Sequence, residues 1–454
     1  MTKRKIIKRS VLIILLAVLA FGVYYSWRSF PIISGYSAKN ACSCLFIQNR
    51  NEKDVINEEL GDFPLSLGSI VVDRQNASVT GSVWGMAKRK AIYRKGFGCT
   101  LVNDFSEKIL RSQTFELPKH DTLHSNNWPS VDSIKQLHFN KEKLDSAFEY
   151  IFSGKYNPDA FTHAALVVYD GQLVAEKYAN GYTDTTKFLG WSVAKSVIGA
   201  LTGILVKEGK LALAQPAPVA QWSNPADKRH NITIENLLQQ TSGLNSQEDY
   251  AGYSEVTNML FNKGDMAGYV AGLPLKDKPD SVFYYSSGNT NLLSGIIRHV
   301  VGEKDYHSFP YTALFYKLGM YHTLLEPDAS GTYVGSSYIY ASARDYARFA
   351  LLYYNDGLWN GERILPEGWV QKTMTPPASN HLKNYGYQFW LNGYDKKDSS
   401  KRAYPDVPAD MYYADGYGGQ DIYIIPSKKL IVVRVGLHTI DENGFLKKVI
   451  NAFQ

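Results

Sequence analysis

The chain has 454 residues, 44% of them hydrophobic and 20% charged, and carries a formal net charge of +6 at pH 7. Five positive charges lie at the very start of the chain, so the remainder is close to neutral, which argues against a nucleic-acid partner. A chain of this length buries a substantial core, and we expect one large domain with a smaller N-terminal part.

The N-terminus combines a basic cluster with an apolar run. Residues 1–10 contain the cluster, and residues 11–27 form a run of about 17 residues that would suit a short membrane-spanning helix or a long signal-peptide core. Tyr24, Tyr25 and Trp27 resemble an interfacial aromatic belt, and no small-x-small cleavage site follows, so we favour an uncleaved anchor over a cleaved signal. The positive-inside rule predicts a single-pass protein of the inner membrane with its catalytic part on the periplasmic side.

Residues 37–102 have a short, alternating pattern, in stretches such as CLFIQNR, that predicts a small strand-rich segment. The three cysteines of the chain, Cys42, Cys44 and Cys99, all lie in this segment. In an oxidising compartment either Cys42 or Cys44 could pair with Cys99. Residues 103–140 are polar and contain prolines, which indicates a connector.

Residues 141–454 have the pattern of one large domain. A helix is predicted from Lys141, and Asp170-Gly171 lies between two alternating runs, which is typical of a β-hairpin. Helical patterns follow in the middle of the domain, and two further strand runs meet at Pro426 before a closing helix. Strands at both ends with helices between them predict an α+β fold, in which an antiparallel sheet of sequence-distant strands carries an inserted all-helical region.

The run WSVAKSV contains Ser192 and Lys195 at the start of a helical pattern. Residues three apart on a helix share a face, so the lysine amine can lie beside the serine hydroxyl. A serine hydroxyl becomes a good nucleophile when an adjacent base takes its proton, and S-x-x-K is the arrangement of one class of acyl-transfer enzymes. No G-x-S-x-G elbow occurs, which disfavours an α/β-hydrolase.

Such an enzyme needs a further proton-relaying group and an oxyanion hole. The stretch FYYSSGN around Tyr285 precedes a helical run and supplies a candidate for the relay. The stretch GYGGQ around Gly418 opens a strand, where glycines allow the substrate backbone to approach closely.

These segments, together with LVVYDGQLVAEKYA, ITIENLLQQTSGL and SARDYARFALLYYNDGLWNG, resemble the β-lactamase-related serine hydrolases from roughly residue 160 onward. That branch contains class C β-lactamases, D-aminopeptidases, family VIII esterases and 6-aminohexanoate-dimer hydrolase. The resemblance implies a β-lactamase/transpeptidase-like fold, with Ser192 as nucleophile, Lys195 as general base and Tyr285 assisting the leaving group. It further implies an oxyanion hole from the backbone N–H groups of Ser192 and Gln420.

Two motifs depart from the β-lactamase form. The usual Y-x-N has Ser287 in place of the asparagine that contacts the substrate amide. The usual K-T-G reads Tyr417, Gly418 and Gly419, without the cation that meets a substrate carboxylate. The resemblance implies that Ser287, Tyr417, Gly418 and Gly419 line the substrate-binding site. We therefore expect a serine hydrolase of a small amide or ester, like the aminohexanoate-dimer hydrolases and esterases. A D-amino-acid peptidase or penicillin-binding protein, and a non-catalytic binding or sensor module, are the alternatives.

No metal or cofactor is expected, because the histidines have no metal-ligand spacing and the cysteines lack histidine partners. The expected partners are a small-molecule substrate and the membrane, and the sequence leaves the oligomeric state open.

Overall fold

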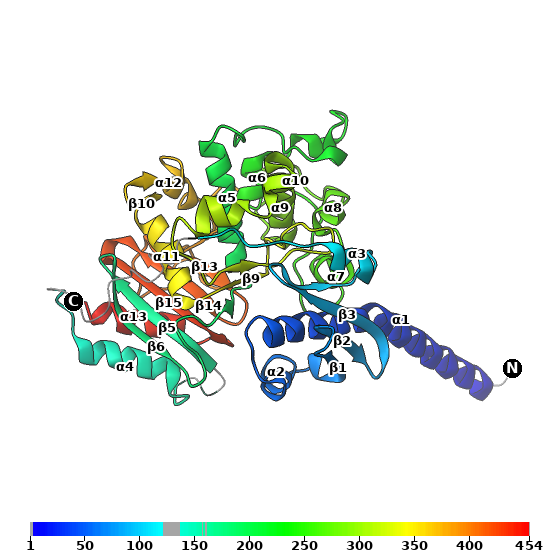
Figure 1. The fold of residues 1–454 in the computed structure, drawn as a ribbon. Helices are drawn as coiled ribbons and strands as arrows, with labels where there is room; N and C mark the ends of the chain where they lie inside the picture. The colour runs from blue at the N-terminus through cyan, green and yellow to red at the C-terminus, as the bar shows by residue number, and fades with distance from the viewer. Residues whose placement is uncertain (1–2, 121–136, 157, 159–160, 454) are drawn as a thin grey trace. The chain divides into compact units, whose positions relative to one another are not determined.

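The computed structural model describes residues 3–120, 137–156, 158 and 161–453 (Figure 1). The predicted connector over residues 103–140 therefore lies partly outside the described residues. The chain divides into two compact units. Unit 1 comprises Met1–Arg94, Gly98–Gln113 and Gln247–Gly264, and unit 2 comprises Lys95–Phe97, Thr114–Ser246 and Asp265–Gln454.

Unit 1 is built on a long helix and a four-stranded antiparallel sheet of order β1-β2-β3-β4. The strands are β1 (Gly68–Asp73), β2 (Ser78–Val83), β3 (Met86–Arg94) and β4 (Gly98–Leu101). The helical elements are α1 (Lys3–Phe46), α2 (Glu52–Glu59), η1 (Leu65–Leu67), α3 (Glu107–Ser112) and α7 (Glu255–Asn262). The helix α7 comes from the middle of the chain, and Asn103 Nδ2 donates to the Phe261 carbonyl at 3.0 Å. The sequence pattern did not separate this segment from its neighbours.

The helix α1 continues well beyond the apolar run, as far as Phe46, and so includes the first three residues of the stretch CLFIQNR, which the alternating pattern predicted as a strand. That part of the prediction was wrong. Ala38, Ala41, Cys42 and Leu45 are all at most 4% exposed, and their spacing of three and four residues is the apolar stripe of a helix packed on a sheet. The first part of α1 is exposed, and among the described residues α1 is long and apolar enough to cross a membrane.

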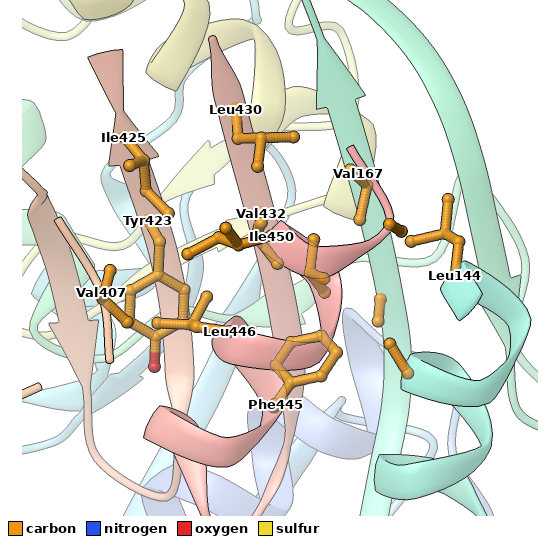
Figure 2. Packing of buried hydrophobic residues seen from close by; sticks show 14 of the residues in the cluster. Leu144, Val167, Val407, Tyr423, Ile425, Leu430, Val432, Phe445, Leu446 and Ile450 are labelled. Atoms are coloured by element: carbon orange, nitrogen blue, oxygen red, sulfur yellow. The ribbon is translucent and has the colours of Figure 1, made fainter. Parts of the chain in front are cut away.

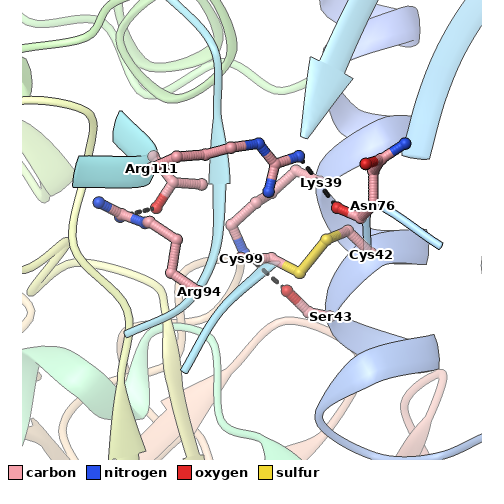
Figure 3. Close-up of a disulfide and its surroundings, with 8 residues drawn as sticks. Lys39, Cys42, Ser43, Asn76, Arg94, Cys99 and Arg111 are labelled. Atoms are coloured by element: carbon pink, nitrogen blue, oxygen red, sulfur yellow. Dashed lines mark hydrogen bonds between the residues drawn. A yellow bond between two sulfur atoms is a disulfide. The ribbon is translucent and has the colours of Figure 1, made fainter. Parts of the chain in front are cut away.

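A disulfide joins α1 to β4, since Cys42 bonds to Cys99 with their Cα atoms 6.0 Å apart (Figure 3). Of the two pairings that the sequence left open, this is the one present, and Cys44 is a free, buried cysteine. Burial raises the pKa of the Cys44 thiol, which keeps it protonated and unreactive. Beside the bridge, the buried ammonium of Lys39 donates to Ser43 Oγ at 3.0 Å.

Replacing both Cys42 and Cys99 with serine is expected to destabilise unit 1. The bridge spans 57 residues of sequence. A cross-link that closes a loop of this length lowers the conformational entropy of the unfolded chain, which raises the free energy of unfolding by about 4 kcal/mol. Thermal melting of the detergent-solubilised full chain with and without dithiothreitol measures the effect. The Cys44→Ser variant is the control and should keep the reductant sensitivity of the wild type. A wild-type melting temperature that does not respond to reductant would contradict the prediction.

Unit 2 contains an antiparallel sheet of six strands in the order β12-β13-β14-β15-β5-β6. The strands are β12 (Trp390–Leu391), β13 (Tyr412–Gly416), β14 (Gln420–Ile425), β15 (Leu430–Leu437), β5 (Phe161–Tyr169) and β6 (Gln172–Tyr178). The C-terminal β15 pairs with β5, the first strand of this sheet in sequence. This pairing confirms a sheet assembled from both ends of the domain, and Asp170-Gly171 forms the predicted hairpin turn between β5 and β6.

Helices cover the sheet. One face packs on α4 (Lys141–Phe152) and α13 (Glu442–Asn451), where Leu144, Val167, Tyr423, Val432 and Phe445 belong to one buried cluster (Figure 2). On both helices the buried residues recur every three to four positions, as an amphipathic helix requires. The helices α5 (Val193–Lys207) and α11 (Ala343–Tyr354) also contact this sheet. Strand β14 is buried along its whole length, so the sheet positions site residues rigidly.

The inserted helical region lies between β6 and β12. Besides α5 and α11, its α-helices in unit 2 are α6 (Ile234–Leu238), α8 (Met266–Ala271), α9 (Ser287–Val301), α10 (Glu303–Tyr306) and α12 (Trp369–Thr373). Two small sheets accompany them, formed by β7 (Phe188–Leu189), β9 (Ile339–Ala341) and β8 (Leu324–Leu325), and by β10 (Leu358–Trp359) and β11 (Glu362–Arg363). Short helical turns in this region are η4 (Ala220–Trp222), η5 (Lys228–Asn231) and η6 (Tyr311–Phe315), whereas η7 (Pro426–Lys428) joins β14 to β15. This arrangement is the predicted α+β architecture.

Candidate active site

The predicted nucleophile lies where strand β7 passes into helix α5. Trp191 has φ +46°, a left-handed conformation that is uncommon for a bulky residue. The chain reverses there, and the Val193 N–H donates to the Gly190 carbonyl at 3.0 Å. Ser192 then occupies the N-cap position of α5, yet its side chain makes no capping hydrogen bond. The hydroxyl is therefore available for chemistry rather than committed to the helix end.

Lys195 is buried one turn into α5, at 1% exposure. Its Nζ lies 3.0 Å from Ser192 Oγ and 2.9 Å from the Ser336 carbonyl oxygen. The same Nζ lies 4.9 Å from the centre of the Tyr285 ring. A buried amine held between a hydroxyl, a carbonyl and an aromatic face can accept a proton from the serine when the amine is neutral. The sequence had no signal for Ser336, because its contribution is a backbone carbonyl from a distant loop.

The two tyrosines of the FYYSSGN stretch differ in their surroundings. Tyr284 is 45% exposed, whereas Tyr285 stacks on Trp390 with ring centres 5.1 Å apart. Tyr385 packs on the edge of Tyr285 at 5.6 Å. The structure thus brings Tyr285, Ser192 and Lys195 together, and the supporting rings come from a segment about 100 residues away in sequence that no local motif identified.

Replacing Tyr285 with phenylalanine is expected to lower kcat by about 10²-fold or more, because a positioned proton donor typically contributes 10²–10⁴. The ring and its stacking on Trp390 stay, so the melting temperature should hardly change. Steady-state kinetics on an ester and an amide measure the effect. Tyr284→Phe is the matched control and should keep wild-type activity. A larger loss in the Tyr284 variant than in the Tyr285 variant would assign the role to the other ring.

A buried amide network holds the tyrosine segment against α5. Gln240 Oε1 accepts from the Ser286 N–H at 3.1 Å and from Asn289 Nδ2 at 2.8 Å. Gln388 Oε1 accepts from Thr290 Oγ1 at 2.7 Å, and the Gln388 carbonyl accepts from Ser196 Oγ at 2.6 Å. Buried networks of this kind specify one arrangement of the backbone when every member is satisfied. Sequence inspection identified neither glutamine.

Ser287, the predicted replacement of the motif asparagine, begins helix α9 and is completely buried. Its neighbour Ser286 caps the helix by accepting from the Gly288 N–H at 3.1 Å. The substrate-binding role of Ser287 stays a prediction.

The GYGGQ stretch forms the turn from β13 to β14, where Gly416 pairs with Gln420. Gly418 and Gly419 both have φ +79°, which favours glycine. Tyr417 at the tip is 72% exposed, and its ring lies edge-on to Trp191 at 5.8 Å. The Gln420 side chain hydrogen-bonds to the Gly436 backbone on β15, so this side chain braces the sheet and leaves the predicted oxyanion role to the backbone N–H.

Arg434 supports this turn from within the sheet. Its side chain is fully buried, and Nη1 donates to the carbonyls of Gly418 at 3.0 Å, Gly419 at 2.7 Å and His438 at 2.9 Å. Burial lowers the pKa of Arg434, and the carboxylate of Asp421 on the paired strand opposes that shift. A guanidinium with several carbonyl acceptors rigidifies a turn whose glycines would otherwise leave it adaptable.

A carboxyl pair lies beside the oxyanion strand. Asp415 and Asp421 face each other across β13 and β14. Burial raises the pKa of Asp415 to about 7, the charge of Glu442 adds to this, and the hydrogen bond from Asp421 and the Lys195 charge oppose it. Burial likewise raises the pKa of Asp421. Two like charges so close disfavour double ionisation, so the pair retains a proton near neutrality.

The Asp415→Asn variant is expected to be more stable than the wild type at pH 8, by roughly 1–3 kcal/mol. The folded wild type binds a proton at Asp415 up to pH about 7, whereas an unfolded aspartate loses it near pH 4. The free energy of unfolding of the wild type therefore falls as the pH rises between these two values. Asparagine does not titrate, so the variant lacks this pH-dependent loss. Melting temperatures of both proteins from pH 5 to pH 8 measure it. Parallel curves for the two proteins would contradict the assignment.

The family model described as Beta-lactamase matches residues 159–436, more than half of the chain. The chain belongs to the beta-lactamase family. The resemblance drawn from the sequence motifs is thereby confirmed, and this beta-lactamase-family protein is a serine hydrolase with the β-lactamase/transpeptidase-like α+β fold.

Proteins similar to this beta-lactamase-family protein include hydrolases whose names do not refer to β-lactams. It is 24% identical over 296 residues to 6-aminohexanoate-dimer hydrolase of Paenarthrobacter ureafaciens, covering 60% of this chain and 72% of that protein. A crystal structure of a family VIII carboxylesterase superposes with a TM-score of 0.54 at 12% identity, covering 70% of this chain and 99% of that one. The structure of EstCE1, a hydrolase with promiscuous acyltransferase activity, gives 0.54 at 15% identity, covering 69% and 98%. At these identities the two structures show the shared fold alone.

Within the described ranges, no group of three or more histidine, cysteine, aspartate or glutamate side chains has the arrangement of a metal site. The expectation of catalysis without a metal stays a prediction.

Proposed function

We propose that this serine hydrolase cleaves a small, uncharged amide or ester through an acyl intermediate on Ser192. The observation that carries the proposal is the placement of Lys195 Nζ, buried and 3.0 Å from Ser192 Oγ. A lysine in this position can take the hydroxyl proton as the serine attacks. Serine needs such a base, because its protonated hydroxyl is a weak nucleophile.

The proposed reaction has two halves. The Ser192 proton passes to Lys195 while Oγ bonds to the substrate carbonyl carbon, and the backbone N–H groups of Ser192 and Gln420 stabilise the oxyanion. The carbon–nitrogen or carbon–oxygen bond then breaks, and Tyr285 and Lys195 deliver the proton to the leaving group. Water repeats the sequence on the acyl-enzyme and releases the acid.

The preference for an uncharged substrate follows from the tip of the β13–β14 turn. Where β-lactam-binding relatives have a cation, Tyr417 presents an exposed ring beside Trp191. Aromatic faces bind apolar groups well but supply no compensating charge for a carboxylate. The similarity to 6-aminohexanoate-dimer hydrolase supports a linear amide as the scissile group.

The helix α1 supports the second element of the proposal, a membrane anchor that holds the hydrolase on the extracytoplasmic side. Its exposed apolar window follows the basic cluster, and the helix runs on without interruption into unit 1. A segment that continues directly into a buried helix suits a retained anchor better than a removed signal peptide.

The test is substrate profiling of the detergent-solubilised full chain on p-nitrophenyl esters, linear amides, D-alanyl peptides and a chromogenic cephalosporin. We expect turnover of esters or linear amides, and labelling of Ser192 by a fluorophosphonate probe. Faster cleavage of D-alanyl peptides would favour a peptidase, and faster cleavage of the cephalosporin a β-lactamase. A folded protein with neither turnover nor label would be a binding module.

A further inference from the structure

Helix α1 changes its surroundings within about two turns. From Ile7 to Tyr25 its side chains are exposed, and from Ile32 to Leu45 they are buried beneath the sheet of unit 1, except for the half-buried Tyr36. Pro31 lies inside this transition and has no N–H for the carbonyl four residues earlier, at Trp27. Such a carbonyl needs water or a polar headgroup, since it would be costly in hydrocarbon. The Trp27 carbonyl therefore fits the polar headgroup level of a bilayer better than its hydrocarbon core.

The tip of the β2–β3 hairpin reaches the same level. Trp84 packs edge-on against Phe30 of α1, with ring centres 5.3 Å apart, yet Trp84 is 68% exposed and Met86 is 51% exposed. Two large exposed apolar side chains at the tip of this hairpin therefore lie close to the point where the exposed part of α1 ends.

A loop from the middle of the chain also reaches this part of α1. The guanidinium of Arg28 lies 3.6 Å from the centre of the Tyr253 ring, and it donates to Tyr24 Oη at 3.0 Å. A Cβ built on Gly252 would lie 3.1 Å from the Tyr25 hydroxyl. Tyr250 in the same loop is 53% exposed.

From these contacts we infer that unit 1 docks on the bilayer surface through an aromatic collar, which inserts among the lipid headgroups of the extracytoplasmic leaflet. The collar consists of Tyr24, Tyr25, Trp27, Trp84, Met86, Tyr250 and Tyr253. Rings with an apolar body and a polar edge are the side chains that concentrate at this depth. The inference rests on the proposed anchor and goes beyond it, because a hairpin and a loop far apart in sequence contribute to membrane contact.

The dimensions and charges fit a bilayer as the partner. From Arg9 to Arg28 a helix rises about 28 Å, close to the hydrocarbon thickness of about 30 Å. The adjoining segments carry Lys88 and Arg89 but also Glu248 and Asp249, so the surface has mixed charge. Zwitterionic lipid should therefore suffice, without a requirement for anionic headgroups.

The experiment uses the full chain in phosphatidylcholine vesicles whose acyl chains carry bromine near the headgroup, so that nearby tryptophans are quenched. Relative to the wild type, Trp84→Tyr should lower the quenched fraction, and Tyr250→Trp should add quenched emission. Val71→Trp is the matched control, since Val71 is 69% exposed on the same sheet. Val71 pairs with Thr80. The residue next to Thr80, Gly81, lies against the Ser34 carbonyl of α1, which is in the buried part of the helix and farther from Trp27 than the hairpin tip is. Its added emission should stay unquenched.

The Trp27→Tyr variant distinguishes a failure of the collar proposal from a failure of the anchor proposal. If the anchor spans the bilayer, this variant loses quenched emission whatever the position of the hairpin. Loss at Trp27 without loss at Trp84 and without gain at Tyr250→Trp would overturn the collar while leaving the anchor intact. A protein that does not sediment with the vesicles and shows no quenching at Trp27 would refute the anchor itself.

Discussion

Ser192→Ala is expected to lower kcat/KM by about 10⁴- to 10⁶-fold on any ester or amide that the wild type cleaves. Without the hydroxyl no acyl-enzyme forms, and the residual rate comes from binding and from the oxyanion donors alone. The fold should be unaffected, since the Ser192 side chain does not cap helix α5. Single-turnover kinetics and fluorophosphonate labelling measure the loss.

Ser281→Ala is the control for this change. Ser281 is exposed, and its hydroxyl donates to the Lys278 carbonyl at 2.6 Å, away from Lys195. That variant should label and turn over like the wild type. A Ser192→Ala protein that keeps full activity would place the nucleophile elsewhere and would remove the basis of the proposed mechanism.

Lys195→Met should lower the acylation rate by about 10³-fold or more, because the serine loses its base while a side chain of similar volume fills the buried site. Lys195→Arg should be similarly impaired, since a guanidinium stays protonated and cannot act as a base. The Arg variant therefore distinguishes a role of Lys195 as a base from a role that needs only its positive charge. Pre-steady-state burst kinetics with a p-nitrophenyl ester measure acylation directly.

Lys207→Met, at the exposed end of the same helix, is the matched control and should leave the burst unchanged. If the burst of Lys195→Met is close to that of the wild type, another group takes the serine proton. In that case the contact between Lys195 and the Ser336 carbonyl would be structural.

Several features of this protein follow from local sequence alone. The spacing of Ser192 and Lys195 places both on one face of a helix whatever surrounds it. The Asp-Gly turn of the β5–β6 hairpin was likewise readable, since a tight turn depends on residues close in sequence. The resemblance of the motif blocks correctly indicated the family.

The local sequence pattern gave a wrong prediction at the end of α1, where packing determines the secondary structure. The stretch CLFIQNR, which begins at Cys44, alternates like a strand. The apolar stripe of the preceding turns packs on the sheet of unit 1, however, so the helix continues to Phe46. A short window shows a period of two, and only the longer helix reveals the stripe that buries the most apolar surface.

The site itself was only partly contained in its motifs. The S-x-x-K spacing determined that a lysine lies beside a serine, because helical geometry is local. Tertiary structure alone decided that the lysine is buried, that the Ser336 carbonyl and the Tyr285 ring are its neighbours, and that Arg434 braces the glycine turn. These contacts join segments about 90 or more residues apart, or adjacent strands of one sheet. Their formation depends on the free energy of the whole packed core, which no local pattern encodes.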